Sequence, residues 1–185
     1  MKNYRILNKQ IFRWEEFALF PIRHKDRYSI MQWRNEQIYH LRQSKLLTKE
    51  DQDQYFDHVI NPLFDQEQPD QILFSFLKGE ECIGYGGLVH INWKDKNAEI
   101  SFIIDTQLEG DFFHFHWKTY LGLLEKVAFE ELGLHKIYTY AFDLRPHLYD
   151  AVEAAGYEKE AVLKEHFFFE GRYKDVVIHV KINKS

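Results

Sequence analysis

Cysteine and long apolar runs are scarce in this sequence, and acidic residues outnumber basic ones. Cys82 is the one cysteine in 185 residues, so no disulfide can form within the chain, and we expect a reducing compartment. The net charge of −5 argues against a general nucleic-acid-binding protein, which normally carries a basic face. No segment has the length of a membrane span, and the N-terminus lacks the apolar core of a signal peptide. We therefore expect a cytoplasmic protein without membrane or nucleic-acid partners.

Aromatic residues, by contrast, are abundant. They make up 17% of the chain among interspersed charges of both signs, which indicates a globular protein with aromatic-lined surfaces as well as an aromatic core. The length fits one domain with a sizeable core, so we expect a single domain over residues 1–185.

The first third of the chain is expected to be largely helical. A short strand at 17–23 precedes residues 27–43, whose apolar positions follow helical spacing and predict one broken helix or two short ones. A further helix is predicted over 47–64, where Thr48 is a good N-cap and Pro62 should end or kink the helix.

The pattern then changes to a period of two residues, which is typical of strands. The expected order is two strands within 72–93, a third over 98–105, a helix from Trp117 to Gly133, a strand over 136–142, a helix over 146–156 and two closing strands over 157–182. This order predicts an α+β protein with a mixed central sheet.

The junction DTQLEGDFFHFHWK, residues 105–118, lies between a predicted strand and a predicted helix. A glycine-rich loop at this place would favour phosphate binding, because glycines let backbone N–H groups surround an anion. Here one glycine is followed by six aromatic or histidine residues. His114 and His116 could suggest a metal, but no third ligand is identifiable nearby, and we predict no metal site.

The element order and several motifs resemble the GNAT superfamily of acyl-CoA-dependent N-acetyltransferases. WRNEQIYHLRQ and LTKEDQDQYF are similar to acceptor-side helices of members that act on ribosomal-protein N-termini and amino-sugar nucleotides. ECIGYGGLVHINWKDKNAEISFIID resembles the family's third and fourth strands, and the tail from AAGYEKE onward resembles the ending of the ribosomal-protein branch. The resemblance implies the GNAT fold, with a mixed, mostly antiparallel central sheet flanked by helices.

The resemblance also implies acetyl-CoA as co-substrate, held where two central strands separate, with its pantetheine arm lying along one strand. The residues at the matching positions are Ser101, Phe102, Ile103 and Ile104 on the strand, and Gln107 and Gly110 in the pyrophosphate turn. That turn departs from the family pattern, because Phe112 replaces a small residue while Glu109 and Asp111 add carboxylates that would repel a diphosphate.

Three interpretations of the departure stay open. The turn could be rebuilt, so that N–H groups near residues 114–117, aided by a histidine or Lys118, still bind phosphate. The acceptor or an unusual acyl carrier could use the aromatic lining instead. Alternatively, the aromatic side chains plug the cleft, and the chain is a non-catalytic GNAT-fold binding or structural protein.

The resemblance implies catalytic residues as well. Glu99 aligns with the family's strand glutamate and is the expected general base, although a solvent-facing strand residue is the alternative. Val152 stands where the family has the tyrosine that protonates the leaving thiolate, so Tyr149 is the candidate substitute. Arg145 replaces the family's asparagine and could bind a CoA phosphate or an anionic acceptor.

The expected acceptor is a primary amine that attacks the thioester directly. It could be an amino-sugar nucleotide, a peptide N-terminus or a small amine, and the residues expected to line its site are Trp33, Arg34, Asn35, Tyr85 and His90. The sequence leaves open whether two subunits pair through a sheet edge as a homodimer.

Overall fold

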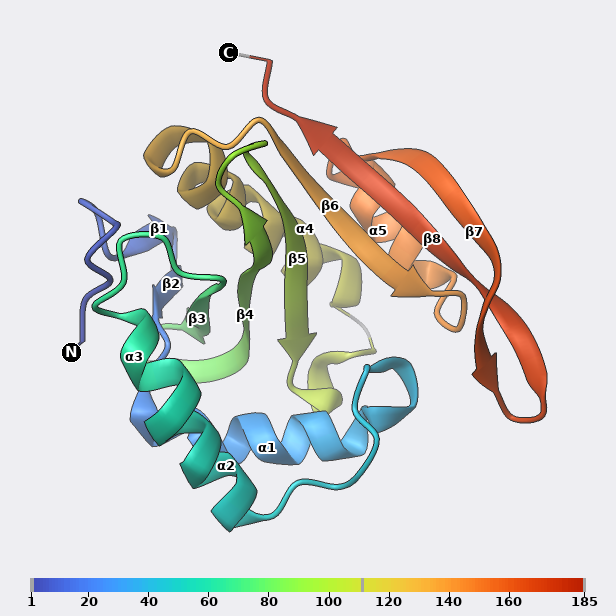
Figure 1. Ribbon diagram of the computed structural model, residues 1–185, viewed down its shortest axis with the longest axis horizontal. Coiled ribbons are helices and arrows are strands. Elements are labelled where there is room, and N and C mark those ends of the chain that lie inside the picture. The colour runs from blue at the N-terminus through green and yellow to red at the C-terminus, as the bar shows by residue number, and fades with distance from the viewer. Residues whose placement is uncertain (1, 111, 185) are drawn as a thin grey trace.

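One sheet organises the chain (Figure 1). The structure is a computed structural model that describes residues 2–110 and 112–184. Within these residues the strands are β1 Phe12–Trp14, β2 Phe17–Pro21, β3 Ile72–Lys78, β4 Glu81–Asn92, β5 Asn97–Ile104, β6 Lys136–Phe142, β7 Glu158–Phe169 and β8 Arg172–Ile182. They are arranged in the order β1-β2-β3-β4-β5-β6-β8-β7, and β5 and β6 run parallel while the other neighbours are antiparallel. The predicted mixed, mostly antiparallel α+β sheet is confirmed.

Helices cover the sheet and one end of its central strands. They are α1 Arg27–Glu36, α2 Lys49–Tyr55, α3 Asn61–Leu63, α4 Phe113–Glu125 and α5 His147–Ala154, with 3-10 turns at His24–Asp26, Ile38–His40 and Thr106–Leu108 and π-helical turns at Phe56–Ile60 and Lys126–Glu131. In Figure 1, α4 and α5 lie behind the sheet, and α1 and α2 lie near the end at which β5 finishes. Within the described residues, no helix has the length and apolar character needed to cross a membrane.

Two elements differ from the sequence prediction. β1 was not predicted, because three residues cannot establish a period of two. The helix predicted to begin near Trp117 begins at Phe113 instead. Its first turn is amphipathic, since Phe113, His116 and Trp117 are buried against the protein while Phe115 is exposed, and this burial stabilises a helix that propensity alone does not predict.

The main core lies between the sheet and α4. Tyr120, Leu121 and Leu124 of α4 are fully buried. The rings of Tyr120 and Phe102 stack with centroids 3.7 Å apart. Burying each such side chain contributes roughly 2–3 kcal/mol to folding, so α4 is fixed firmly beneath β5.

Gly86 lets β4 approach its neighbours closely. A Cβ at this position would lie 2.0 Å from the carbonyl oxygen of Ser101 and 2.6 Å from the hydroxyl of Tyr120. That hydroxyl donates a hydrogen bond to the same Ser101 carbonyl over 2.8 Å. Glycine is therefore required here by space, and the contact fixes the position of β5 relative to α4.

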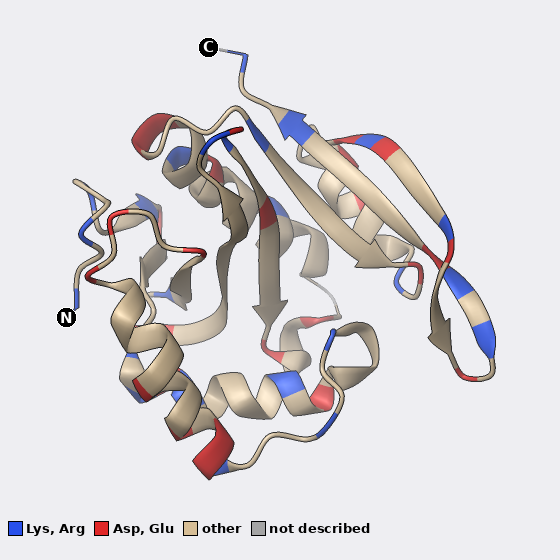
Figure 2. Ribbon diagram, in the orientation of Figure 1, with Lys and Arg blue, Asp and Glu red and all other residues tan. Residues whose placement is uncertain are grey.

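Charged residues are distributed over most elements. Figure 2 shows Lys and Arg interspersed with Asp and Glu, without one sign covering a whole face of the ribbon. Cys82 on β4 is half-buried, and its thiol donates to the carbonyl of Gly84 over 3.2 Å. Burial raises the pKa of this thiol to about 12, so it stays protonated and is a poor nucleophile at neutral pH.

Candidate active site

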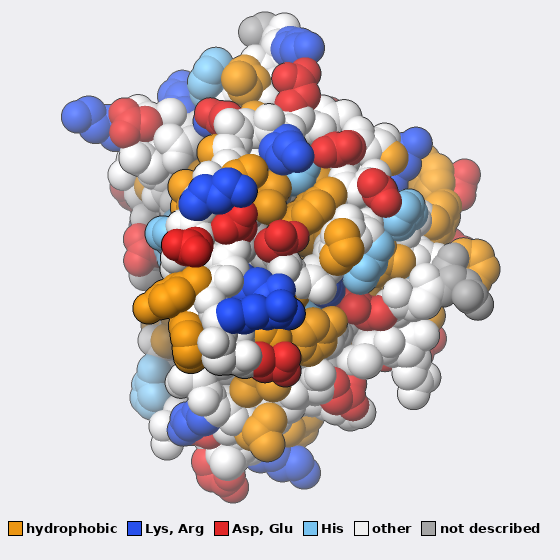
Figure 3. All heavy atoms as spheres, turned by 90° about the vertical axis from the view of Figure 1, so that its right-hand side faces the viewer, with side chains coloured by type: hydrophobic (Ala, Val, Ile, Leu, Met, Phe, Trp, Pro, Cys, Tyr) orange, Lys and Arg blue, Asp and Glu red, His pale blue; other side chains and the backbone are white. Residues whose placement is uncertain are grey.

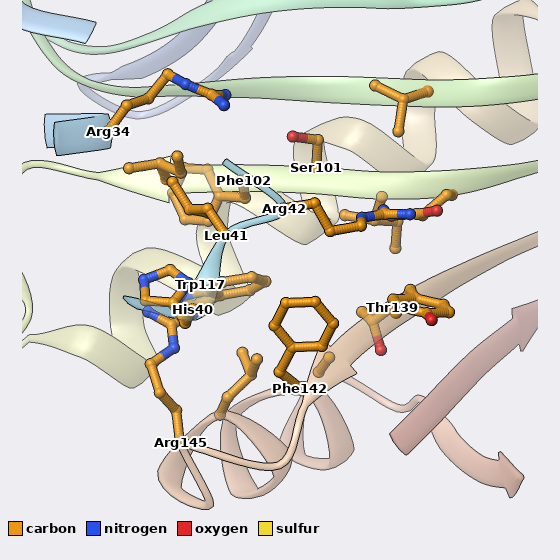
Figure 4. Close-up of a pocket in the computed structure, with 17 residues that line it drawn as sticks. Arg34, His40, Leu41, Arg42, Ser101, Phe102, Trp117, Thr139, Phe142 and Arg145 are labelled. Atoms are coloured by element: carbon orange, nitrogen blue, oxygen red, sulfur yellow. The ribbon is translucent and has the colours of Figure 1, made fainter. Parts of the chain in front are cut away.

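The site lies where β5 and β6 separate. The two strands pair over Asn97–Glu99 and Lys136–Tyr138, and among the described residues the pairing stops there. A cleft of about 210 Å³ opens beyond that point (Figure 4). Its lining consists of Arg34, His40, Leu41, Arg42, Val89, Glu99, Ile100, Ser101, Phe102, Ile103, Trp117, Thr139, Tyr140, Ala141, Phe142, Arg145 and Leu148.

The backbone of β5 has groups directed into this cleft. The N–H of Asp105 donates to Ile83, on the β4 side, over 2.8 Å. Because N–H and C=O directions alternate along a strand, Phe102 and Ile104 direct theirs toward the separated β6. The Ile104 carbonyl accepts a hydrogen bond from the Gln37 amide over 2.7 Å. The strand can therefore pair with an extended ligand, and Gln37 already contacts one of the groups involved.

The backbone groups of Ser101 and Ile103 point in the opposite direction from those of Phe102 and Ile104. The same alternation directs their backbone groups toward β4, while both residues line the cleft. All four residues predicted for the pantetheine arm thus lie at or beside the cleft.

Glu99 occupies the closed end of the cleft, at the last paired residue of β5. Glu99 is 6% exposed, and its carboxylate accepts a hydrogen bond from the guanidinium of Arg42. Nε2 of His90 lies 3.8 Å from the other carboxylate oxygen. Burial raises the pKa of Glu99 above its ordinary value, while the charges of Arg42 and His90 oppose this rise. A carboxylate with a raised pKa is well suited to accept a proton.

Arg42 covers Glu99 from the segment that follows α1. Its guanidinium carbon lies 4.7 Å from the centroid of the Tyr140 ring, on the opposite wall of the cleft. The arginine therefore bridges the β5 and β6 walls by an ion pair on one side and a cation–π contact on the other.

The predicted pyrophosphate turn is built differently from the family pattern. Asp105 caps the 3-10 turn that follows β5, accepting from the N–H of Gln107 over 3.0 Å. Gln107 lines a separate hollow beside α1 together with Trp33 and Glu36, and it does not line the cleft. Gly110 accepts from the N–H of Phe113 over 3.3 Å. Asp111, the second predicted carboxylate of this turn, lies outside the described residues.

Arg145 and Glu109 form an ion pair at the open end of the cleft. Nη1 of Arg145 donates to Oε1 of Glu109 over 2.9 Å, and the two side chains are 7% and 18% exposed. The carboxylate expected to repel a diphosphate is thus neutralised by the arginine expected to bind one. His40 lies nearby, and burial together with the charge of Arg145 lowers the pKa of its imidazole to about 3, so His40 is neutral at physiological pH.

The aromatic run does not fill the cleft. Phe112 and Phe115 are 61% and 43% exposed, and Phe115 packs against Phe17 of β2 with ring centroids 5.6 Å apart. Trp117 is the residue of this run that lines the cleft, among the lining residues that are described. His114 is exposed and His116 is buried, so the two histidines point apart on the helix.

The five residues predicted for the acceptor fall into two groups. Arg34 lines the cleft and donates to the hydroxyl of Tyr85 over 2.5 Å, and His90 contacts Glu99. Trp33 is buried in the core and lines the separate hollow. Asn35 binds the backbone of Leu47, accepting from its N–H over 2.8 Å and donating to its carbonyl over 2.9 Å. Trp33 and Asn35 therefore support the fold around the cleft instead of lining it.

Tyr149 points away from the cleft. Its hydroxyl donates to Asp143 over 2.8 Å, and its ring stacks on His179 with centroids 5.3 Å apart. Burial and the Asp143 carboxylate raise the pKa of Tyr149. Leu148, its neighbour on α5, lines the cleft. In this conformation Tyr149 lies outside the set of residues that a substrate in the cleft would contact.

The sequence interpretation missed the segment that covers the cleft. Gln37, His40 and Arg42 lie in or next to the 3-10 turn after α1, in a region that was predicted only as a helix. Gln37 contacts a residue 67 positions later in the chain, and Arg42 contacts one 57 positions later. No local pattern signals contacts of this range.

Comparison with known proteins identifies the fold. The family model described as the acetyltransferase (GNAT) domain matches residues 20–178. The solved structure of spermidine N-acetyltransferase from Vibrio cholerae in complex with CoA and spermine has a TM-score of 0.79 and 22% identity, over 91% of this chain and 96% of that chain. A dodecameric structure of the same Vibrio cholerae enzyme in an intermediate state has a TM-score of 0.74 and 24% identity, over 91% and 95% of the two chains. At these identities the likeness shows the fold.

A curated relative is similar in sequence over a shorter region. Spermidine N(1)-acetyltransferase of Vibrio cholerae serotype O1 is 34% identical over 97 residues, which is 52% of this chain and 54% of the relative. The match thus spans about half the length of that relative. The family model, in contrast, covers most of the strands and helices described above, from the end of β2 into β8. The chain belongs to the GNAT acetyltransferase family.

Proposed function

We propose that this protein transfers the acetyl group of acetyl-CoA to the primary amine of a small molecule or peptide. The observation that carries the proposal is the cleft between β5 and β6, with the buried carboxylate of Glu99 at its closed end. Acetyl-CoA supplies a thioester, which activates the acetyl group toward attack by an amine.

The chain offers groups that suit the pantetheine arm and the phosphates of this co-substrate. The outward-directed backbone of Phe102 and Ile104 suits the amides of the pantetheine arm, as in the addition of a strand to a sheet edge. The N-terminus of α4 suits the phosphates, because the first turn of a helix has backbone N–H groups without intrahelical partners. Arg145, at the same end, forms an ion pair with Glu109 and balances its charge, which removes one source of repulsion.

Glu99 accepts the proton in the proposed reaction. A neutral or deprotonating amine attacks the acetyl carbon, the C–N bond forms and the C–S bond breaks. Two protons leave the ammonium form overall: one is taken up by the thiolate to give free CoA, and the other passes to Glu99, directly or through water, and then to solvent. No protein nucleophile is needed, since Cys82 lies outside the cleft and its thiol stays protonated.

Two tyrosines are candidates for the general acid that protonates the thiolate. Tyr149, the predicted acid, would have to leave Asp143 to reach the cleft. Tyr140 already lines the cleft and is a second tyrosine to test for this role. A Tyr140→Phe protein that loses turnover while it still binds CoA would favour Tyr140, and the matching Tyr149→Phe protein tests the original prediction.

We also propose that copies of this chain associate. β7 is the outer strand of the sheet, and the β7–β8 hairpin exposes Phe168 and Tyr173. Figure 3 faces this side of the molecule and shows hydrophobic side chains among the charged ones. Sedimentation of the purified protein would test for a homodimer, and a monomer at all concentrations would contradict this proposal.

Binding of acetyl-CoA is the first test of the proposed function. We expect saturable binding with a Kd near or below about 100 μM, which is a binding free energy of roughly −5.5 kcal/mol or stronger. Tryptophan fluorescence and the thermal midpoint are the two readouts. The fluorescence change should be largely lost in Trp117→Phe, because Trp117 lines the cleft, and kept in Trp93→Phe, whose indole donates to Pro69 elsewhere.

Absence of acetyl-CoA binding would also decide between the two functions. No change in either readout at millimolar acetyl-CoA would overturn the proposal and favour a non-catalytic GNAT-fold protein. If binding is seen, release of free thiol with an amine completes the test. Spermidine belongs in that acceptor screen, because the curated relative is named for it.

A further inference from the structure

We infer that the acceptor amine also carries an anionic group, a carboxylate or a phosphate, and that Arg34 binds that group. The inference rests on the proposed acetyl transfer and adds the class of substrate. Three arginines, Arg34, Arg42 and Arg145, line the cleft.

Arg34 differs from the other two arginines in its partners. Nη1 donates to the hydroxyl of Tyr85 over 2.5 Å and Nε donates to the amide oxygen of Gln43 over 2.9 Å. Neither partner is a carboxylate, and Arg34 forms no ion pair among the described residues. Arg42 and Arg145, in contrast, are paired with Glu99 and Glu109.

Among the described residues, the cleft therefore has one positive charge more than it has carboxylates to balance it. Arg34 is half-buried, and Tyr85 beneath it is buried. A partly desolvated guanidinium without an anion is costly, and a ligand that supplies the anion recovers that cost through charge-assisted hydrogen bonds. Tyr85 and Gln43 also hold the guanidinium in a fixed orientation, which favours a planar carboxylate or a phosphate.

The sheet places Arg34 on the same face as the proposed base. Tyr85 is opposite Ile103 in the pairing of β4 and β5, and Glu99 lies four residues before Ile103, an even number that puts both side chains on one face. Figure 4 shows Arg34 and Ser101 on one side of the cleft, Arg145 and Phe142 on the other, and Arg42 between them.

This placement sets the spacing between the two ends of the acceptor. Four residues of strand span about 13 Å, and the Arg34 side chain can shorten that distance. An amine near Glu99 and an anion at Arg34 must therefore be separated by several bonds. A polyamine would instead place its second ammonium beside Arg34, where like charges repel.

A matched set of six-carbon acceptors tests the inference. The probes are 6-aminohexanoate, 6-aminohexyl phosphate, 6-amino-1-hexanol and 1,6-diaminohexane, with spermidine added, and the readout is kcat/KM for thiol release from acetyl-CoA. We expect at least one anionic acceptor to exceed the alcohol by about tenfold or more, and the diamine to be the poorest of the four. The better of the two anionic acceptors identifies the preferred group.

Substitution of Arg34 provides the second arm of the test. Arg34→Gln should lower kcat/KM for the preferred anionic acceptor by about 10- to 100-fold, mainly through KM, while the value for the alcohol stays within about twofold. Arg34→Lys keeps the charge and should retain part of the preference. The control is Arg5→Gln, which removes an exposed arginine paired with Glu67 and should change neither value. Thermal midpoints and acetyl-CoA affinity of each variant check that the fold is kept.

The outcomes separate this inference from the proposed function. If the diamine or spermidine is preferred to both anionic acceptors, the inference is overturned and acetyl transfer stands. If acetyl-CoA does not bind, the proposed function fails, and calorimetric titration of 6-aminohexanoate and 6-aminohexyl phosphate decides the anion site alone. Binding that Arg34→Gln abolishes would then support the site, and no binding to the unmodified protein would overturn it.

Discussion

Arg42 donates a hydrogen bond to the carboxylate of Glu99 across 57 positions of the chain, and the pair lies at the last point where β5 and β6 are joined. The proposed base is thus held by a cation that is itself half exposed to solvent. The contact orients the carboxylate and also makes it less basic than burial alone would.

Replacing Glu99 tests its role directly. Glu99→Gln keeps the shape and removes the proton acceptor, so kcat should fall by about 10²- to 10⁴-fold while acetyl-CoA affinity changes little. Stopped-flow or steady-state thiol release gives the first quantity, and fluorescence titration gives the second. Unchanged turnover would remove Glu99 from the mechanism.

The pH dependence of turnover should reveal the Arg42–Glu99 pair. The proposed mechanism requires the deprotonated carboxylate of Glu99, so we expect kcat/KM to fall as the pH drops through the pKa of Glu99. Burial raises that pKa and Arg42 lowers it, hence Arg42→Gln should raise it and move the acidic limb of the profile to higher pH.

His90→Asn is the matched comparison for this shift. His90 lies 3.8 Å from the carboxylate and is largely exposed, so its removal should move the acidic limb in the same direction by a smaller amount. A shift of the Arg42→Gln profile to lower pH would contradict the assignment of the limb to Glu99.

Gly86→Ala should destabilise the protein by about 3 kcal/mol, the upper end of the range for overpacking, because its Cβ would collide with the Ser101 carbonyl. The control is Gly122→Ala on α4, where a Cβ meets nothing within 4 Å and alanine favours the helix by about 0.5–1 kcal/mol. Urea unfolding of both variants measures the difference. Equal stabilities would show that β4 can move away from β5 at little cost.

The Arg145–Glu109 pair should be strongly coupled. Both side chains are mostly buried, so each single substitution to glutamine leaves a charge without its partner and should cost about 2–4 kcal/mol of unfolding free energy. The double variant should recover part of that loss. The double-mutant cycle formed by these variants should give a coupling energy of about 1–3 kcal/mol.

The exposed pair of Lys136 and Glu160 serves as the control for that cycle. Its atoms are 2.6 Å apart but the side chains are 29% and 47% exposed, so solvent screens the interaction. Its coupling should be below about 0.5 kcal/mol. Similar coupling energies in the two double-mutant cycles would mean that burial does not strengthen the ion pair at the open end of the cleft.

Local patterns predicted the elements well wherever local energies decide them. Thr48 was predicted as an N-cap, and it accepts from the N–H of Asp51 while the Asp51 carboxylate accepts from the N–H of Thr48. Gly133 ends its helix in a left-handed conformation, with φ at +61°. In both places the residues that determine the structure are neighbours in the chain.

The cleft could be predicted only in part, since its important contacts are not local. Glu99, the β5 segment and Arg145 were found because each stands at a position that resembles the family pattern. The pairing of Arg145 with Glu109, the approach of Arg42 and the contact of Arg34 with Tyr85 depend on segments that meet only in the folded chain. The start of α4 was misplaced for the same reason, because tertiary burial of Phe113 outweighs weak helix propensity.

The three-residue ladder between Asn97–Glu99 and Lys136–Tyr138 has a mechanical consequence. The sheet consists of two groups of strands, β1 to β5 and β6 to β8, which are joined by this short ladder and otherwise held together by the helices behind them. A molecule that pairs with the free edge of β5 and contacts Tyr140 of β6 would connect the two groups of strands directly. Occupation of the cleft should therefore stiffen the whole sheet, and amide hydrogen exchange along β6 and β8 would slow together with that along β5.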